Sequence, residues 1–212
     1  MRKTIIGIVT SLSAFPALAD TLTIAALGDS LTQGYGLPAV DGFVPQLQSW
    51  AQAQGIEVTL INAGVSGDTT AGGLSRAAWS LTPQVDAVIV TLGGNDLLRG
   101  IDPAVSRANL MGVLQAAQDA EVEVLLIGMK APGNFGPEYK TSFDAIYPEL
   151  ATQFGTLYLD SFFAGFGDAV NDPASLWTFM QSDGIHPNRE GVRLIVEGIG
   201  PKFVELVGLV KD

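Results

Sequence analysis

The chain has 212 residues, no cysteine, one histidine and a formal net charge of -11 at pH 7. An acidic surface repels phosphate backbones and anionic lipids, so this composition argues against nucleic-acid binding and against strong peripheral attachment to membranes. We also expect no stable membrane insertion. With no cysteine there is neither a disulfide nor a lipoprotein anchor, and one histidine leaves too few ligands for zinc, although calcium bound by carboxylates stays open.

Residues 1–19 have the pattern of a secretory signal peptide. Arg2 and Lys3 give the charged start, residues 4–15 the apolar run, and Ala17-Leu18-Ala19 the cleavage site. The apolar run of about twelve residues is shorter than the roughly twenty that a membrane span requires. We therefore expect cleavage near Ala19, a periplasmic or secreted product, and one domain over residues 20–212.

Four continuous apolar runs have the length of buried parallel strands. They cover residues 22–27, 58–61, 87–92 and 124–127, and a shorter strand is expected at residues 156–159. Helical patterns lie between these runs. The alternation predicts a doubly wound α/β/α sandwich, which has three layers, around a parallel sheet of about five strands.

The clearest helical pattern follows Asp102-Pro103, where a capping residue precedes a proline at the first helical position. Its apolar residues recur at helical spacing and form one predicted buried face: Leu110, Val113, Leu114 and Ala117. A further helix is expected between Pro137 and Phe154. The last helix has a similar apolar face, formed by Val192, Ile195, Val196 and Ile199, and Pro201 is expected to break or kink it.

Residues 161–187 form the one long stretch without a regular pattern. A connection of this length in a compact domain is usually either functional or wrongly assigned. We expect its aromatic residues to form a small additional core, with direct ligand contact as the alternative: Phe162, Phe163, Phe166, Trp177 and Phe179.

Polar turns that contain glycine follow the first three predicted strands. They are Gly28-Asp29-Ser30, residues 62–68 and Gly93-Gly94-Asn95-Asp96. Because the carboxyl ends of parallel strands lie at one edge of the sheet, where open α/β sheets bind ligands, these turns should meet. Glycine there lets the backbone approach a ligand and leaves amide hydrogens free to point at it.

His186, the only histidine, follows Asp183 by three residues. Histidine acts as a general base near neutral pH when a carboxylate fixes its tautomer, so this pair can activate a hydroxyl. Ser30 is the expected nucleophile. The expected oxyanion donors are the backbone amides of Ser30 and Gly67 and the side-chain amide of Asn95. The alternative is that Asp183 and His186 form only a polar turn before the next helix.

Other common motifs are missing from the sequence. There is no Gly-x-Ser-x-Gly elbow, no Gly-x-Gly-x-x-Gly dinucleotide fingerprint and no phosphate-binding Gly-Lys-Ser/Thr loop. We therefore expect no cofactor and no metal in the reaction.

Together, these segments resemble the GDSL, or SGNH, hydrolase family. Gly28-Asp29-Ser30-Leu31, the Gly67 turn, Gly93-Gly94-Asn95-Asp96 and Asp183-x-x-His186-Pro187 match the family's four blocks in order. Further segments are similar to those of a bacterial periplasmic subgroup of multifunctional esterases: residues 66–69, 92–96, 98–100, 145–148 and 183–189.

The resemblance implies a flavodoxin-like fold, a catalytic triad of Ser30, Asp183 and His186, and an oxyanion hole formed by Ser30, Gly67 and Asn95. It also implies a serine esterase that hydrolyses acyl thioesters, lysophospholipids and simple aryl or short-chain esters. We expect a monomer whose partner is a small lipophilic ester or fatty-acyl substrate. A carbohydrate acetylesterase of the same fold is the enzymatic alternative, and a non-catalytic periplasmic binding domain is the alternative of another class.

In the subgroup, the loop after the asparagine block moves when an acyl chain binds, and here that loop would be residues 97–102. Leu97 stands where glycine is expected, which leaves the mobility of the loop and the preferred chain length open. Apolar residues near the site are expected to contact the substrate, with simple packing against neighbouring helices as the alternative: Leu97, Leu98, Ile101, Phe135 and Tyr139.

Overall fold

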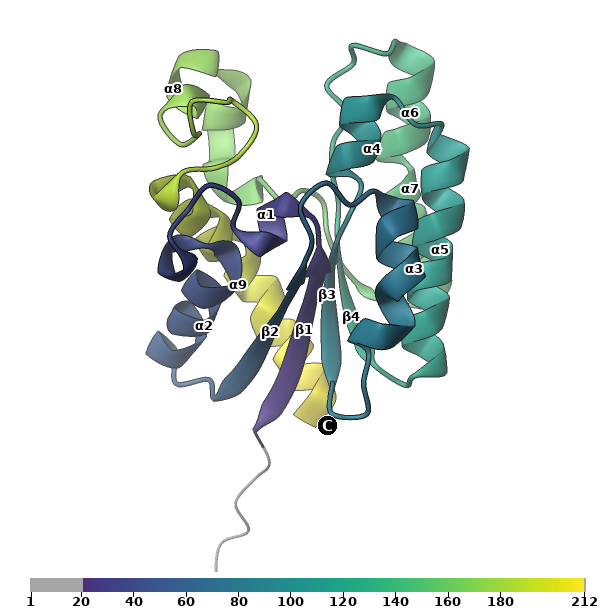
Figure 1. The fold of residues 1–212 in the computed structure, drawn as a ribbon, viewed down its shortest axis with the longest axis vertical. Helices are drawn as coiled ribbons and strands as arrows, with labels where there is room; N and C mark the ends of the chain where they lie inside the picture. The colour runs from purple at the N-terminus through teal and green to yellow at the C-terminus, as the bar shows by residue number, and fades with distance from the viewer. Residues whose placement is uncertain (1–20, 212) are drawn as a thin grey trace, which may run out of the picture.

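The computed structural model describes residues 21–211, so the expected signal peptide lies outside the described residues. Five parallel strands form one sheet in the order β2-β1-β3-β4-β5 (Figure 1). The strands are β1 (Leu22–Gly28), β2 (Val58–Gly64), β3 (Ala87–Thr91), β4 (Glu123–Ile127) and β5 (Leu157–Leu159). The predicted fold class and all five predicted strands are confirmed.

Helices cover both faces of the sheet, which explains why the central strands are continuously apolar. One layer contains α2 (Phe43–Ala53) and α9 (Arg189–Lys211). The opposite layer contains α3 (Thr70–Ser80), α5 (Pro103–Asp119) and α7 (Ile146–Phe154). Shorter helices lie beyond the carboxyl ends of the strands: α1 (Ser30–Gln33), η1 (Ala39–Asp41), α4 (Gly94–Arg99), α6 (Pro137–Asp144), η2 (Ala164–Asn171) and α8 (Pro173–Trp177).

The strand register brings the polar turns together. Gly28, the last residue of β1, is paired with Gly64 on one side and with Thr91 on the other. The three strands therefore end at the same level, and the turns that follow them start side by side. This confirms the expectation that these turns meet at the carboxyl edge of the sheet.

The predicted apolar faces of α5 and α9 are buried. Asp102 caps α5 by accepting a hydrogen bond from the Ala104 N–H at 2.9 Å. The four predicted core residues on each helix are at most 3% exposed: Leu110, Val113, Leu114, Ala117, Val192, Ile195, Val196 and Ile199. Both helices are thus held by amphipathic burial rather than by helix propensity alone.

One helix prediction requires correction, and of the two outcomes expected at Pro201, a break or a kink, the break does not occur. The region between Pro137 and Phe154 forms α6 and α7, which meet at Ala145, rather than one helix. Pro148 has no N–H to donate to the Asp144 carbonyl, so a continuous helix would lose that bond. Pro201, in contrast, does not break α9, which continues to Lys211. The fully buried Phe203 shows that the apolar face of α9 extends beyond the proline.

The stretch at 161–187 contains η2 and α8 and carries a chain of aromatic contacts. The Phe162, Phe163, Phe166 and Phe179 rings follow one another with centroids 5.4 to 5.5 Å apart, and Phe162 also contacts Phe43 of α2. These phenylalanines pack together as predicted, but they extend the main core instead of forming a separate one: Phe162 and Phe166 belong to it, and Phe163 and Phe179 pack against it. Trp177 is different, because it is 60% exposed and covers Gly184 instead of joining the core.

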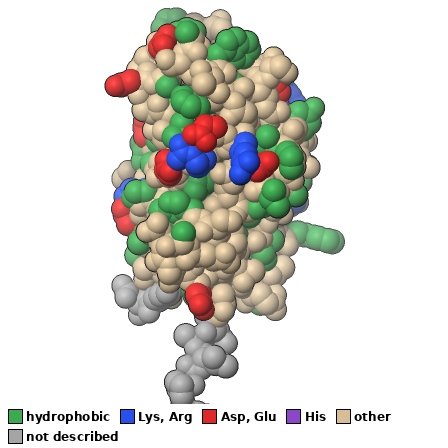
Figure 2. Space-filling model, turned by 90° about the vertical axis from the view of Figure 1, so that its left-hand side faces the viewer, with side chains coloured by type: hydrophobic (Ala, Val, Ile, Leu, Met, Phe, Trp, Pro, Cys, Tyr) green, Lys and Arg blue, Asp and Glu red, His purple; other side chains and the backbone are tan. Residues whose placement is uncertain are grey.

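Charged side chains on the surface are interspersed by sign. Figure 2 shows the left-hand side of Figure 1, where basic side chains lie next to acidic ones instead of forming a broad basic patch. Arg193 of α9, for example, is paired with Glu190 and Glu197. Within residues 21–211, no helix is long and apolar enough to cross a membrane.

Candidate active site

Ser30 lies in a tight turn directly after the buried strand β1. Asp29 caps the short helix α1, because its Oδ1 accepts a hydrogen bond from the Leu31 N–H at 3.0 Å. The Asp29 carbonyl accepts a second bond from the Gln33 N–H at 2.9 Å. These bonds fix the backbone on both sides of Ser30, whose side chain is half-buried at the edge of the sheet.

Asp183, His186 and Ser30 form one hydrogen-bonded series. His186 Nδ1 lies 2.7 Å from Asp183 Oδ2, and His186 Nε2 lies 2.9 Å from Ser30 Oγ. With the Nδ1 proton donated to the carboxylate, the Nε2 lone pair faces the serine hydroxyl. The structure thus brings together the three residues of the predicted triad, although Ser30 and His186 are 156 positions apart.

The Asp183 carboxylate is held by the turn that carries the histidine. Its Oδ1 accepts the N–H groups of Ile185 and His186 at 2.9 and 3.0 Å. The backbone bond from His186, the bond from its ring and the bond from Ile185 lower the pKa of Asp183 to about 2. Asp183 therefore remains ionised at neutral pH and holds His186 in the tautomer described above.

Tyr35 covers the imidazole of His186. The two rings are tilted, with centroids 4.6 Å apart. Gln181 joins the segments that carry them, because its Nε2 donates to the Tyr35 carbonyl at 2.8 Å and to the Pro187 carbonyl at 2.9 Å. Tyr35 lies five residues after Ser30, and neither Tyr35 nor Gln181 was identified from the sequence, since a lone aromatic or glutamine in a loop carries no pattern.

The expected oxyanion donors come from three different turns. Ser30 N and Gly67 N donate no hydrogen bond to any described residue. The Asn95 side chain donates from Nδ2 to Asp29 Oδ2 at 3.3 Å, which leaves its second hydrogen unused by that bond. Three N–H groups near Ser30 thus remain for an incoming oxygen atom.

Glycine is required at position 93, directly before the turn that carries Asn95. Gly93 has φ of +116°, and a Cβ there would lie 2.1 Å from the hydroxyl of Tyr147. That hydroxyl, fully buried in α7, donates to the Leu92 carbonyl at 2.8 Å. Tyr147 therefore fixes the end of β3 and with it the start of α4.

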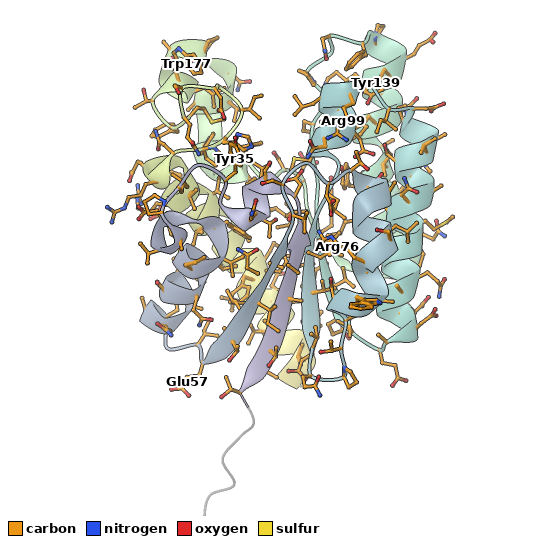
Figure 3. The ribbon with its side chains drawn as sticks, in the orientation of Figure 1. Tyr35, Glu57, Arg76, Arg99, Tyr139 and Trp177 are labelled. Atoms are coloured by element: carbon orange, nitrogen blue, oxygen red, sulfur yellow. The ribbon has the colours of Figure 1, made fainter. Side chains whose placement is uncertain are left out.

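A buried carboxylate and a half-buried guanidinium hold the turns against one another. Asp96, fully buried, accepts bonds from the N–H and the hydroxyl of Thr70 and from the Ser106 hydroxyl. It thereby joins α4 to α3 and α5. Arg76 of α3, labelled in Figure 3, donates to the carbonyls of Gly28 and Ala63 at the ends of β1 and β2 and pairs with Asp68 at 2.6 Å.

Asp29 is a buried carboxylate next to Ser30, with only 2% of its surface exposed. Burial raises the pKa of Asp29 to about 6, while hydrogen bonds from Leu31 and Asn95 and the charge of His186 act in the opposite direction. Asp29 therefore has an ordinary structural position, as a helix cap, but an unusually high proton affinity for an aspartate.

The expected substrate-contacting residues lie on α4, on α6 or directly next to these helices, but they differ in exposure. Leu97 packs against the core, whereas Leu98 is 60% exposed. Phe135, 45% exposed, contacts Tyr139 with ring centroids 5.1 Å apart and lies over Gly100. Figure 3 shows Tyr139 on the same side as Arg99, opposite Tyr35 and Trp177.

The expected loop at residues 97–102 is partly helical. Leu97, Leu98 and Arg99 form the last turn of α4, which ends at Gly100. Asp102 already caps α5, so few residues lie between the two helices. Ile101 is half-buried in this short connection. Arg99, four residues after Asn95, was not identified from the sequence, although this helical spacing is the signal that would have found it.

Among the described residues, no group of three or more histidine, cysteine, aspartate or glutamate side chains could hold a metal ion.

A hydroxyl, an imidazole and a carboxylate aligned at the carboxyl edge of an α/β sheet form the constellation of the serine hydrolases, a class that includes esterases and peptidases. Residues 26–194 match the model of the GDSL-like lipase/acylhydrolase family. The chain belongs to this family, and it is an ester-hydrolysing enzyme.

The similarity to characterised proteins extends over most of the chain. The chain is 35% identical to the esterase TesA of Pseudomonas aeruginosa over 190 residues. The aligned region covers 89% of this chain and 91% of that protein. The chain is 38% identical over 192 residues to thioesterase 1/protease 1/lysophospholipase L1 of Escherichia coli strain K12, with 90% and 86% covered. The solved structure of a psychrotrophic esterase, EstA from a Pseudoalteromonas species, inhibited by monoethylphosphonate, matches with a TM-score of 0.78 at 29% identity, covering 88% of this chain and 98% of that one.

Proposed function

We propose that this enzyme is a serine esterase in which Ser30 is the nucleophile, His186 the general base and Asp183 the residue that orients the base. The observation that carries the proposal is the continuous series from Asp183 Oδ2 through the imidazole to Ser30 Oγ, with steps of 2.7 and 2.9 Å. The amides of Ser30, Gly67 and Asn95 are proposed as the oxyanion donors, since they approach the same edge of the sheet.

In the acylation step, Ser30 Oγ attacks the ester carbonyl carbon while its proton passes to His186 Nε2. The carbonyl oxygen becomes an oxyanion, which the three amide donors stabilise. The bond from carbon to the leaving oxygen or sulfur then breaks, and the imidazolium returns the proton to the leaving group. The product is an acyl-Ser30 enzyme plus a free alcohol or thiol.

In the deacylation step, water replaces the alcohol. Neutral His186 removes one proton from water as its oxygen attacks the acyl carbonyl, and a second oxyanion forms in the same position. The bond to Ser30 Oγ breaks, and the proton on His186 returns to Ser30. The net reaction is hydrolysis, with the enzyme regenerated and no cofactor consumed.

Small lipophilic esters and fatty-acyl thioesters are the proposed substrates. The exposed Leu98 and Phe135 supply an apolar surface beside the site, and the similar proteins are named esterase, thioesterase and lysophospholipase. The apolar run at residues 4–15 supports export to the periplasm or the medium, and we propose that the released chain, residues 20–212, is one domain that acts as a monomer.

A fluorophosphonate probe tests the nucleophile, because it forms a stable phosphonyl ester with an activated serine. Purified protein should be labelled once, at Ser30, and Ser30→Ala should lose both labelling and esterase activity. Ser66→Ala is the matched control, since the hydroxyl of Ser66 is bonded to Gln33 in an exposed turn rather than to the imidazole. Labelling at Ser66, or full activity in Ser30→Ala, would reject the assignment.

A substrate panel tests the chemical class. Rates on p-nitrophenyl esters from acetate to palmitate, on acyl-CoA and on an acetylated sugar should be highest for the lipophilic acyl groups. A strong preference for the acetylated sugar would instead identify a carbohydrate acetylesterase of the same fold, and no turnover of any ester would leave only a binding function.

A further inference from the structure

Arg99 links the two segments that carry the proposed oxyanion donors Gly67 and Asn95. Its Nη2 donates to the Gly67 carbonyl at 2.9 Å and lies 3.4 Å from Asn95 Oδ1. Arg99 follows Asn95 by four residues on α4, so the two side chains lie on the same face of the helix. Figure 3 places Arg99 beside α4, above the ends of the strands.

The two ends of the Asn95 amide face partners of opposite kind. Nδ2 donates to Asp29 Oδ2 at 3.3 Å, and Oδ1 faces the guanidinium of Arg99. A carboxylate only accepts hydrogen bonds and a guanidinium only donates them. Turning the amide by about 180° would direct its oxygen at the carboxylate and its NH₂ at the guanidinium, so both bonds would be lost. The charges therefore select the orientation in which an Nδ2 hydrogen stays free for the oxyanion.

The contact with Gly67 restrains a glycine in an exposed turn. Gly67 has φ of +84° and lies in an exposed turn, and a Cβ built on it would be 3.8 Å from Arg99 Nη2. Among the described residues, only the Arg99 guanidinium donates a hydrogen bond to the Gly67 carbonyl. A bond on that carbonyl limits rotation of the turn and therefore the direction of the Gly67 N–H.

We propose that Arg99 is a positioning residue of the oxyanion hole, which orients the Asn95 amide and the Gly67 turn without touching the reacting atoms. The role rests on the proposed function, because it requires that Gly67 and Asn95 face the oxyanion. Since a misaligned donor weakens binding of the charged transition state more than that of the neutral ester, the effect falls on kcat.

Arg99→Met, which keeps a long side chain but no donor, is the first test. With the neutral substrate p-nitrophenyl butyrate, kcat should fall about 10- to 50-fold while KM stays within about twofold. Arg99→Lys should recover part of the loss, because an ammonium donates but lacks the planar fork. Arg107→Met is the matched control: Arg107 pairs with Glu149 on the outer face of α5 and should keep the wild-type rate.

A double-mutant cycle separates positioning from direct substrate contact. In an Asn95→Ala background, Arg99→Met should cost no more than about threefold, because the amide that Arg99 orients is gone and only the Gly67 contact remains. An equal loss in both backgrounds, or a raised KM with unchanged kcat, would overturn the positioning role. If Ser30→Ala is inactive but Arg99→Met is fully active, the positioning role of Arg99 is rejected and the proposed function stands. If Ser30→Ala is active, the proposed function itself is rejected.

Discussion

Asp29 combines three contacts in one buried carboxylate: it caps α1, accepts from Asn95 and lies next to Ser30. Its pKa is raised from 3.8 to about 6 by burial. Between these two values the folded protein binds a proton that the unfolded chain has released. The stabilisation that results is fully present below about pH 4 and is lost as the pH rises through about 6.

We therefore predict that Asp29→Asn changes the pH dependence of stability. Relative to the variant, the wild-type free energy of unfolding should decrease by up to about 3 kcal/mol between pH 4 and pH 7, since one pKa unit corresponds to about 1.36 kcal/mol. Urea unfolding at half-unit pH intervals measures this difference. Parallel curves for the two proteins would mean that the carboxyl group of Asp29 titrates equally in the folded and unfolded chains.

Asp183 has the opposite perturbation, because hydrogen bonds lower its pKa to about 2. We predict that Asp183→Asn lowers kcat by about 10⁴-fold at neutral pH, since an amide can stabilise the wrong tautomer of His186. Stopped assays on a reactive aryl ester can follow such a slow variant. Asp172→Asn is the control, because Asp172 also has a pKa lowered by local hydrogen bonds, from Ser175 and Ala174, but only caps α8. Similar rates in both variants would contradict the role of Asp183.

At the scale of elements, α4 presents one face to the core and one to solvent. Leu97 packs inward and Leu98 is 60% exposed beside the site, so Leu98 is the better test of acyl-chain contact. Each buried methylene is worth at most about 0.8 kcal/mol, and Leu98→Ala should lower the ratio of kcat/KM for long and short esters about 3- to 30-fold. Leu209→Ala, on an exposed position of α9, should leave the ratio unchanged. An unchanged ratio in Leu98→Ala would remove α4 from the substrate surface.

Helix α9 contains an internal proline, which we expect to lower the stability of the protein. Pro201 is exposed and cannot donate to the Glu197 carbonyl. Pro201→Ala should raise the free energy of unfolding by about 1 to 3 kcal/mol, partly offset by the greater freedom of the unfolded chain. Pro103→Ala is the control, because Pro103 occupies the first turn of α5, where no N–H is required. Chemical denaturation of both variants gives the comparison.

Over the whole molecule, the predictable part of the structure is the part encoded locally. The apolar runs gave the strands, and the glycine-bearing turns gave the edge at which Ser30, Gly67 and Asn95 meet, because parallel strands share one direction. The boundary between α6 and α7 was not predicted, because it depends on a single missing N–H at Pro148 rather than on a repeating pattern.

The parts of the site that were missed depend on contacts between distant segments. Tyr35 meets His186, and Arg99 meets Gly67, only after the chain has folded. A lone aromatic residue in a loop has no periodicity that marks it, and the helical spacing of Asn95 and Arg99 indicates their own contact but not the contact of Arg99 with Gly67. Ser30, Asn95, Asp183 and His186 could be predicted because their own side chains carry chemistry, and Gly67 because it lies in a glycine-bearing turn. The residues that were missed contact these groups across the fold.

The separation of 156 positions between Ser30 and His186 also has a kinetic consequence. Closing so long a loop is entropically costly and slow, and an incomplete chain cannot bring imidazole and hydroxyl together. Of the three tryptophans, only Trp50 is partly buried, with its ring against Gly200 of α9. Replacing the other two tryptophans, in Trp79→Phe and Trp177→Phe, leaves Trp50 as the one tryptophan whose fluorescence is measured. During refolding from urea, hydrolysis should then never recover before the fluorescence of Trp50. The recovery of hydrolysis would then report the packing of α9 against the rest of the protein, because the refolding enzyme stays inactive until this last helix has packed.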